Sequence, residues 1–389
     1  MINSLKITNV GPISNADIEF GDLTVFVGPQ ACGKSICSQF LKLIQDTGFI
    51  KNELETFGFD WKNEWSRFLQ IYFGEGMNSI WKEDSKIIYD NESFDETRLK
   101  KARMPRQAEI KNFYIPAQRT TTIENGWLKP FNGFDSSFPY VLKSFSENIR
   151  QTMDKSFIKD SSTIFPQDNI LKKGLREIIE KNIYRNSRMV IKEISNRKAV
   201  FLEIGDSKNH ISFGSWSTGQ REFAPLLFGL YWALPSSKTT VKSGIDTIVI
   251  EELEMGLHPK AIIAIMSLII ELLNRGYKVV LSTHSNIVLD VMWAINTIKG
   301  HKNSENRILE IFGIENLYNK KKWAKKCLEK IYKIYYFEKT ENGETKFNTK
   351  DISSLDPGND DPDLAGWGGL SGESGRIADI VSTVFDTAE

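Results

Sequence analysis

Short apolar runs and longer amphipathic stretches alternate along the first part of the chain. Residues 5–7 and 16–20 alternate between apolar and polar positions, and residues 23–27 form a β-branched apolar run, as strands do. That run ends at Gly28, and a helical pattern follows over residues 34–45. The pattern predicts a small antiparallel lead-in, then a buried strand, a glycine loop and a helix.

The same alternation returns in the second half of the chain. Apolar runs predict strands at residues 112–115, 245–250 and 277–281, and amphipathic patterns predict helices at residues 260–273 and 286–298. Parallel strands need such crossover helices, which cover both faces of a sheet. The predicted fold class is therefore α/β, with a mixed or parallel sheet flanked by helices.

Two segments interrupt this pattern and are interpreted as an inserted, mainly helical lobe. The first mixes aromatic and charged positions without a lasting period, and the second is helical only in parts. The end of the chain is predicted to form a helix, a hairpin and a Gly- and Asp-rich tail, a region where a partner could dock. The expected division is a head domain at residues 1–45, 110–120 and 185–300, the lobe at residues 46–109 and 121–184, and the C-terminal region at residues 301–389.

The composition is that of a folded protein, with 40% hydrophobic and 26% charged residues. Lys plus Arg equal Asp plus Glu at 50 each, so a surface for nucleic acid or membrane would have to be a local patch. The N-terminus lacks the basic and apolar regions of a secretory signal, and three cysteines without metal-ligand spacing fit a reducing compartment. We therefore expect a cytoplasmic protein that does not enter a membrane.

The glycine loop has the sequence GPQACGKS, from Gly28 to Ser35. It matches the phosphate-binding pattern G-x-x-x-x-G-K-[ST] and stands between a predicted strand and a predicted helix, as that pattern requires. Backbone N–H groups of residues 29–34 would surround the β-phosphate, Lys34 would reach the β- and γ-oxygens, and Ser35 would bind Mg²⁺. The loop predicts a nucleotide site.

Polar residues follow two of the later predicted strands. Glu251 and Glu252 end one strand, and beside a triphosphate one acid can hold Mg²⁺ through water while the next polarises the attacking water. Glu252 is the candidate general base. His284 follows the next strand, where an imidazole could bond the γ-phosphate and the attacking water.

Two further features have an open interpretation. Gln118 could contact Mg²⁺ or the attacking water, and Arg119 the phosphates or a neighbouring subunit, although a plain surface turn explains both residues equally well. The stretch FGSWSTGQREF, over residues 213–223, places small polar residues before a strongly apolar helical run. A helix start leaves backbone N–H groups unpaired and carries a partial positive charge, so it can receive an anion.

The order of these motifs resembles the ABC-type ATPase head shared by transporter subunits, SMC and RecF proteins and OLD-like ATPases. The opening, in which the first strands run straight into the loop, resembles the SMC, RecF and OLD branch. The pattern E-E-x-E-x-x-L-H-P at residues 251–259 resembles OLD-like members in particular. The likeness covers residues 1–45, 110–120 and 185–300, and the lobe and the C-terminal region lie outside it.

The resemblance implies ATP and Mg²⁺ as ligands and gives each motif a role. Lys34, Glu252 and His284 would be the catalytic residues, with Glu251 in the position of the usual aspartate and Gln118 in that of the Q-loop glutamine. The residues implied to line the ATP site are Gly28, Pro29, Gln30, Ala31, Cys32, Gly33, Lys34, Ser35, Ile36, Gln118, Ser217, Gly219 and Gln220, and those implied at the metal are Ser35, Gln118 and Glu251.

The resemblance also implies partners. Ser217 and Gly219 would belong to a signature motif that closes over the ATP of a second copy, which implies a homodimer or a higher oligomer. Relatives without a nuclease domain suggest an ATP-driven switch that controls a separate effector protein in bacterial anti-phage defence. Two alternatives stay open: a RecF- or SMC-like ATPase that binds DNA, and an ATP-bound scaffold that does not hydrolyse its nucleotide.

Two features near the end of the chain suggest other activities. Asp361 and Asp363 have the spacing of the metal-binding acids in the Toprim nuclease domain of full OLD proteins, but they lie in a Gly- and Pro-rich loop with no apolar strand before it. We therefore do not expect a nuclease. Seven lysines between Lys320 and Lys333, with Trp323 and Tyr332 among them, could form a basic face for nucleic acid, and a solvated helix face is the simpler interpretation.

Overall fold

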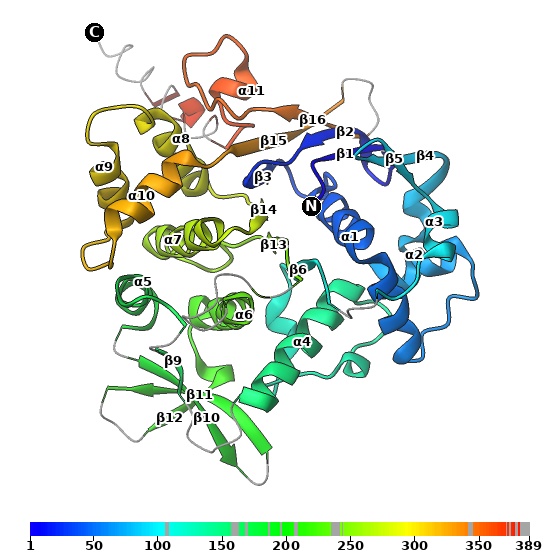
Figure 1. Ribbon diagram of the computed structural model, residues 1–389, viewed down its shortest axis with the longest axis horizontal. Coiled ribbons are helices and arrows are strands. Elements are labelled where there is room, and N and C mark those ends of the chain that lie inside the picture. The colour runs from blue at the N-terminus through cyan, green and yellow to red at the C-terminus, as the bar shows by residue number, and fades with distance from the viewer. Residues whose placement is uncertain are drawn as a thin grey trace.

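A ten-stranded sheet forms the centre of the protein (Figure 1). The computed structural model describes residues 1–105, 109–156, 163–167, 170–185, 187–194, 197–205, 209–234, 242, 244–340, 345–370, 372, 375–377 and 380–381. In spatial order the strands of the large sheet are β5 (Glu92–Phe94), β4 (Trp81–Tyr89), β1 (Ser4–Val10), β2 (Ile13–Glu19), β16 (Phe347–Asp351), β15 (Tyr332–Lys339), β3 (Leu23–Val27), β14 (Lys278–Ser282), β13 (Thr247–Glu251) and β6 (Asn112–Ile115).

Five neighbouring strands, β15, β3, β14, β13 and β6, all run parallel. The other half of the sheet is mainly antiparallel, with one parallel pair between β16 and β2. The α/β fold with an antiparallel lead-in is therefore confirmed. Parallel strands bring their carboxyl ends to one edge of a sheet, which is where ligands bind in such folds.

Helices cover both faces of the parallel strands (Figure 1). Successive residues of a strand face opposite sides, so Ile248 and Ile250 belong to one hydrophobic core while Val249 belongs to the other. The helices are α1 (Lys34–Thr56), α2 (Trp65–Phe73), α3 (Glu96–Lys101), α4 (Tyr140–Ser156), α5 (Lys173–Ile179), α6 (Thr218–Ala233), α7 (Pro259–Arg275), α8 (Asn286–Ile298), α9 (Ser304–Phe312), α10 (Lys320–Glu329) and α11 (Pro362–Ala365).

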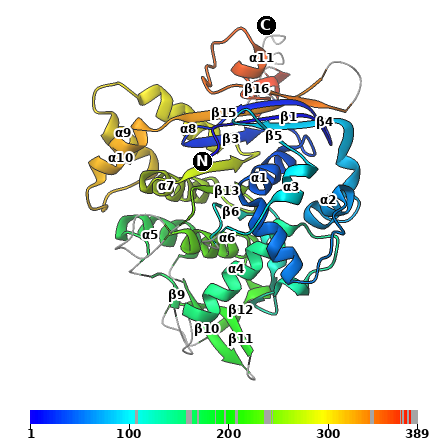
Figure 2. The ribbon, with the colours of Figure 1, turned by 45° about the vertical axis from the view of Figure 1, so that its right-hand side comes forward.

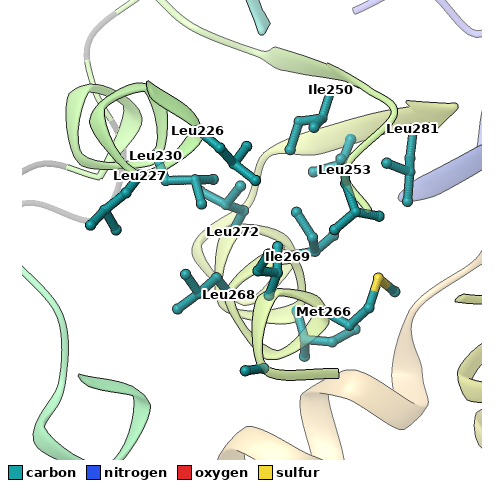
Figure 3. Packing of buried hydrophobic residues seen from close by; sticks show 14 of the residues in the cluster. Leu226, Leu227, Leu230, Ile250, Leu253, Met266, Leu268, Ile269, Leu272 and Leu281 are labelled. Carbon is teal, nitrogen blue, oxygen red and sulfur yellow. The ribbon is translucent and has the colours of Figure 1, made fainter. Parts of the chain in front are cut away.

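The core beneath β13 and β14 fixes the helices that border the site. The side chains in contact there come from α6, α7 and the strands (Figure 3), namely Leu226, Leu227, Leu230, Leu268, Ile269, Leu272, Ile250 and Leu281. Helix α7 begins with Pro259 after the cap residue His258 and ends at Gly276, whose φ is +108°. Sequence signals therefore set both ends of this helix, and burial of its apolar residues holds it against the sheet.

A smaller four-stranded sheet lies at the opposite end of the molecule from β16 and α11 (Figures 1 and 2). Its strands, in spatial order, are β12 (His210–Ser212), β11 (Arg197–Ile204), β10 (Ser187–Ile194) and β9 (Thr163–Phe165). The remaining elements are the hairpin β7 (Ile123–Glu124) and β8 (Trp127–Leu128), the 3₁₀ turns η1 (Met77–Ile80), η2 (Arg119–Thr122), η3 (Phe131–Gly133) and η5 (Phe213–Ser215), and the π turn η4 (Glu180–Tyr184).

The structure differs from the expected elements at four places. Helix α1 does not end at residue 45 but continues after a kink at Asp46, whose carboxylate accepts the N–H groups of Lys111 and Asn112 before β6. Residues 46–109 contain strands as well as the expected helices, because β4 and β5 extend the large sheet. The C-terminal hairpin is not a separate tail, because β15 and β16 lie between β3 and β2.

The single helix expected before the C-terminal hairpin is two helices, α9 and α10, which are followed by β15. Within the part of the chain that the structure describes, none of the helices has the length and apolar character that crossing a membrane requires.

Candidate nucleotide site

The predicted motifs meet at the carboxyl edge of the parallel strands. Phe26, Ser282 and Glu251 lie in one row across β3, β14 and β13, because these strands pair in that register. The loop over residues 28–35 begins two positions after Phe26, and His284 lies two positions after Ser282, so both follow their strands at the same level of the sheet. Three separate stretches of sequence are brought to one edge by strand pairing alone.

The loop between β3 and α1 needs glycine at two positions. Gly28 has φ +145°, and a Cβ there would lie 3.0 Å from the carbonyl oxygen of Phe337. Gly33 has φ +105°, and a Cβ there would lie 2.5 Å from Cγ1 of Ile13. Gly33 is also the N-cap of α1 and supplies no side-chain cap, so the first N–H groups of this long helix are available to an anion.

Lys34 is folded over the same loop. Its Nζ donates hydrogen bonds to the carbonyl oxygens of Gly28 and Pro29, at 2.9 and 2.7 Å, and lies 3.5 Å from Sγ of Cys32. Only 6% of the side chain is exposed. A cation held in this position lies where the phosphate-binding pattern places the lysine that contacts β- and γ-phosphates.

Glu251 has the surroundings of a metal ligand. It is buried, and its Oε2 accepts the N–H of Ala117 at 3.2 Å. Burial raises the pKa of this carboxyl, and the nearby hydroxyls of Ser35 and Tyr114 and the N–H of Ala117 oppose that rise. Oε1 is buried without a hydrogen-bond partner among the described residues. An orphaned carboxylate oxygen beside a serine hydroxyl fits Mg²⁺, which takes few protein ligands and completes its shell with phosphate and water.

Within the described ranges there is no group of three or more His, Cys, Asp or Glu side chains that could hold a metal ion.

Glu252 stands on strained backbone. Its φ is +43°, a left-handed conformation that is uncommon for residues other than glycine and costs on the order of 1–3 kcal/mol. The N–H of Glu252 donates to the carbonyl oxygen of Ser282 at 3.0 Å, and its own carbonyl accepts from Arg119 at 3.1 Å. Contacts on both sides hold the conformation that directs this acid out of the strand.

His284 is half-buried at the end of β14. Burial lowers the pKa of its imidazole, and the positive charge of Lys34 lowers it further, so the ring is neutral at physiological pH. Its backbone N–H donates to the carboxylate of Glu254. Sequence reasoning gave no role to Glu254, although it is the third acid of the E-E-x-E pattern.

The predicted signature begins helix α6. Ser217 is its N-cap, and Ser217 and Gln220 form a capping box in which each side chain bonds the other residue's backbone N–H, at 3.4 and 3.2 Å. Ser217 and Thr218 are exposed, whereas Trp216 before them is buried. The pattern S-T-G-Q is thus a helix start presented on the surface, as the sequence predicts.

A family described as "AAA domain, putative AbiEii toxin, Type IV TA system" matches residues 23–290, which run from β3 into α8 and cover more than half of the chain. The chain belongs to this AAA domain family. The sequence has no match among curated proteins.

Solved structures of three ATPase heads are similar to this AAA domain. An SMC head bound to the C-terminal winged-helix domain of ScpA is 11% identical, with 90% of this chain and 97% of that chain covered and a TM-score of 0.43. The SMC head domain from Thermotoga maritima is 10% identical, with 90% and 98% covered and a TM-score of 0.34. A bacterial ABC transporter cassette solved as a dimer is 15% identical, with 73% and 89% covered and a TM-score of 0.32.

Gln118 and Arg119, which follow β6, differ in their exposure to solvent. Gln118 is exposed at the end of this strand, next to Ala117, whose N–H bonds Glu251. The expectation that Arg119 contacts phosphates or a neighbouring subunit is wrong, because its side chain is fully buried and donates to main-chain carbonyls.

The C-terminal features have structural roles. Lys350 pairs with both Asp361 and Asp363, at 2.6 and 2.9 Å, so these acids hold the segment before α11 against β16. Trp323 is buried and packs edge-on against Phe312, so it cannot stack on a base as an exposed ring would. The exposed lysines of α10 therefore lack an aromatic partner at this position.

Proposed function

We propose that this AAA domain binds ATP with Mg²⁺ between two copies of the chain and hydrolyses it. The observation that carries the proposal is the meeting of the loop lysine, the two acids and the histidine at the ends of three adjacent strands. The exposed helix start at Ser217 and Gly219 shares no hydrogen bond with them among the described residues. In this proposal, the helix start of one copy completes the site of a second copy.

The residues at the site divide the work of phosphoryl transfer. Lys34 and the N–H groups at the start of α1 would hold the phosphates, while Ser35 and Glu251 would hold Mg²⁺, directly and through water. The ion, when bound, neutralises charge on the phosphate oxygens. Glu252 would accept the proton of the attacking water, and the neutral ring of His284 would bond that water or the γ-phosphate.

Closure of the two copies around ATP would act as a switch. Binding of the γ-phosphate to both copies favours the closed pair, and hydrolysis removes that preference, so the nucleotide sets the geometry of the pair. We propose that a separate effector responds to this geometry in bacterial anti-phage defence. The matching family's description names a toxin of a toxin–antitoxin system, and an effector of that kind is compatible with an ATPase that restrains or releases it.

A cavity gives a partner access to the signature helix. It has a volume of about 690 Å³ and lies between the hairpin β7–β8, strand β11 and the start of α6, with Thr120, Ala199 and Glu222 in its wall. A ligand or a partner's side chain in this cavity would contact the element that faces the second copy, which supports effector control through α6.

Steady-state hydrolysis tests the core of the proposal. We expect Lys34→Ala to lose ATP binding, and Glu252→Gln to keep ATP binding while the turnover number falls by about a hundredfold or more. Glu252→Gln should also accumulate as an ATP-dependent dimer in light scattering, whereas Lys34→Ala should stay unassociated. Turnover by Glu252→Gln at the rate of the unmodified chain would reject hydrolysis through this site.

A capture experiment with the same two variants tests the role of the pair. Glu252→Gln with ATP is the closed bait and Lys34→Ala is the open control, so an effector that reads closure should be enriched by only one of them. Ala199→Trp, which fills the cavity, should weaken that enrichment if the effector contacts α6 there. Enrichment of duplex DNA instead would favour the RecF- or SMC-like alternative, and full biological function in Glu252→Gln would favour the scaffold.

A further inference from the structure

Arg119 is the largest fully buried side chain of the described residues. A buried cation is costly unless its donors are satisfied, and an ion pair is the usual solution. No carboxylate within the described ranges lies at ion-pair distance from Arg119. Its guanidinium donates instead to four main-chain carbonyl oxygens, those of Pro116 at 3.3 Å, Glu251 at 2.9 Å, Glu252 at 3.1 Å and Glu222 at 3.3 Å.

These carbonyl oxygens belong to three separate elements. Pro116 is in the turn after β6, Glu251 and Glu252 end β13, and Glu222 lies in the first turns of α6, the helix that begins with the signature. The five N–H groups of a guanidinium form a rigid planar fork, so one Arg side chain can bond all three elements at once. A lysine ammonium concentrates its donors at a single atom and cannot span the same acceptors.

We infer that Arg119 is a positioning residue that couples the signature helix to the backbone of the two acids, an inference that rests on the proposed function. The carbonyl of Glu252 is fixed by Arg119 and its N–H by Ser282, so the strained backbone of the candidate base is held between β14 and this guanidinium. Movement of α6 when a second copy closes over ATP would therefore act on Glu252 through one side chain.

The charges around Arg119 are consistent with this role. Burial lowers the pKa of Arg119, whereas the carboxylates of Glu222, Glu254, Glu252 and Glu251 favour its charged form, and a guanidinium stays protonated in proteins. The Glu222 side chain accepts a hydrogen bond from the Thr120 hydroxyl at 3.4 Å. Arg119 donates to the main-chain carbonyl of Glu222 and not to its carboxylate. Substitution of the surrounding acids would leave the linkage in place, and substitution of Arg119 is needed to break it.

The variant Arg119→Lys keeps the buried charge and removes the fork. We expect its affinity for a fluorescent ATP analogue to stay within about threefold of the unmodified chain, because the loop at Gly28 is untouched, while the turnover number falls by about tenfold or more. The matched control is Lys143→Met, which removes a buried cation of α4 whose Nζ lies 4.8 Å from the centre of the Phe59 ring. It should change neither quantity by more than about twofold. Unchanged turnover in folded Arg119→Lys, or equal losses of binding and turnover, would overturn the inference.

Hydrogen exchange of the isolated chain separates this inference from the proposed function. Arg119→Lys should speed exchange by about tenfold or more both at residues 217–222 and at residues 251–258, without change at residues 28–35. Lys143→Met should leave all three segments as they are. A chain that does not hydrolyse ATP but shows this paired change would reject the proposed function and keep the coupling. A change in one of the two segments alone would overturn the coupling itself.

Discussion

A Cβ placed on Gly219 would lie 2.9 Å from the carbonyl oxygen of Gly256. The first turn of the signature helix therefore packs directly on the loop that follows the two acids. Gly256 has φ +67°, and a Cβ there would lie 3.2 Å from side-chain atoms of Thr218 and Glu222. The two glycines allow a contact between main chains that no larger residue would permit.

Gly219→Ala should lower the turnover number without weakening helix α6. Alanine favours a helix interior over glycine by about 1 kcal/mol, so the helix itself should not weaken, but the added methyl group must displace the Gly256 loop. We expect ATP affinity to be kept while the turnover number falls by about tenfold or more. Gly214→Ala is the control, because a Cβ there meets nothing within 4 Å. Equal turnover in both variants would show that the contact has no part in hydrolysis.

Ser217→Arg tests the surface that we assign to a second copy. Loss of the cap should cost about 1 kcal/mol in both Ser217→Arg and Ser217→Ala, so their stabilities, measured by urea unfolding, should be similar. Only arginine adds bulk to the exposed helix start. We expect Ser217→Arg to bind ATP but to lose ATP-driven association in light scattering and hydrolysis, whereas Ser217→Ala keeps association. Association of both variants to the same extent would place the contact elsewhere.

The residues of the site were predictable because each motif follows a strand in the sequence. Lys34, Glu252 and His284 come from three distant stretches, yet each has a local signal, and parallel pairing must bring such strand ends to one edge. The helix start at Ser217 was predictable from another local signal, the small polar residues that precede an apolar helical run. The assignment of ligands and roles to these residues stays a prediction.

Long-range pairings and burial were not predictable. Hairpin strand β15 lies beside β3 although more than 300 residues separate them. The sequence of β15 does not indicate which strand it pairs with. Arg119 carries a polar side chain after a strand, which is typical of a turn, but four backbone carbonyls from distant segments surround it. Both features depend on which segments meet in space, and local patterns do not contain that information.

Glu251→Gln should make the protein more stable when no nucleotide is present. Burial raises the pKa of Glu251, so the folded state favours the protonated acid. The contribution of protonated Glu251 to the free energy of unfolding is complete below the ordinary carboxyl pKa. It is lost as the pH rises through the raised pKa of the folded state. Glutamine is neutral at every pH. We expect its melting temperature to exceed that of the unmodified chain by about 1–3 °C near pH 8, with no difference near pH 4.

When Mg²⁺ and ATP are present, the unmodified chain should have a higher melting temperature than Glu251→Gln, because an amide is a poorer ligand for the ion than a carboxylate. Exposed Glu83→Gln is the control and should not change the melting temperature under either condition. A pH-independent difference between Glu251→Gln and the unmodified chain would mean that the acid is ionised in the folded protein even without nucleotide.

Phe337→Ala tests whether the C-terminal hairpin supports the binding of ATP. Phe337 is fully buried, contacts Phe26 edge-on with ring centroids 5.6 Å apart, and its main chain backs Gly28 in the phosphate-binding loop. Loss of the ring should cost about 3–5 kcal/mol in urea unfolding. Because the cavity lies under the loop, ATP affinity should also fall by about tenfold in the fraction that stays folded.

Phe94→Ala, in edge strand β5, provides the comparison for that result. Phe94 is as buried as Phe337, so its loss should cost a similar free energy of unfolding, but it belongs to a strand at the far edge of the sheet from β3. We expect its ATP affinity to match that of the unmodified chain. Equal losses of affinity in the two variants would mean that general destabilisation, and not support of the loop by β15, accounts for the effect.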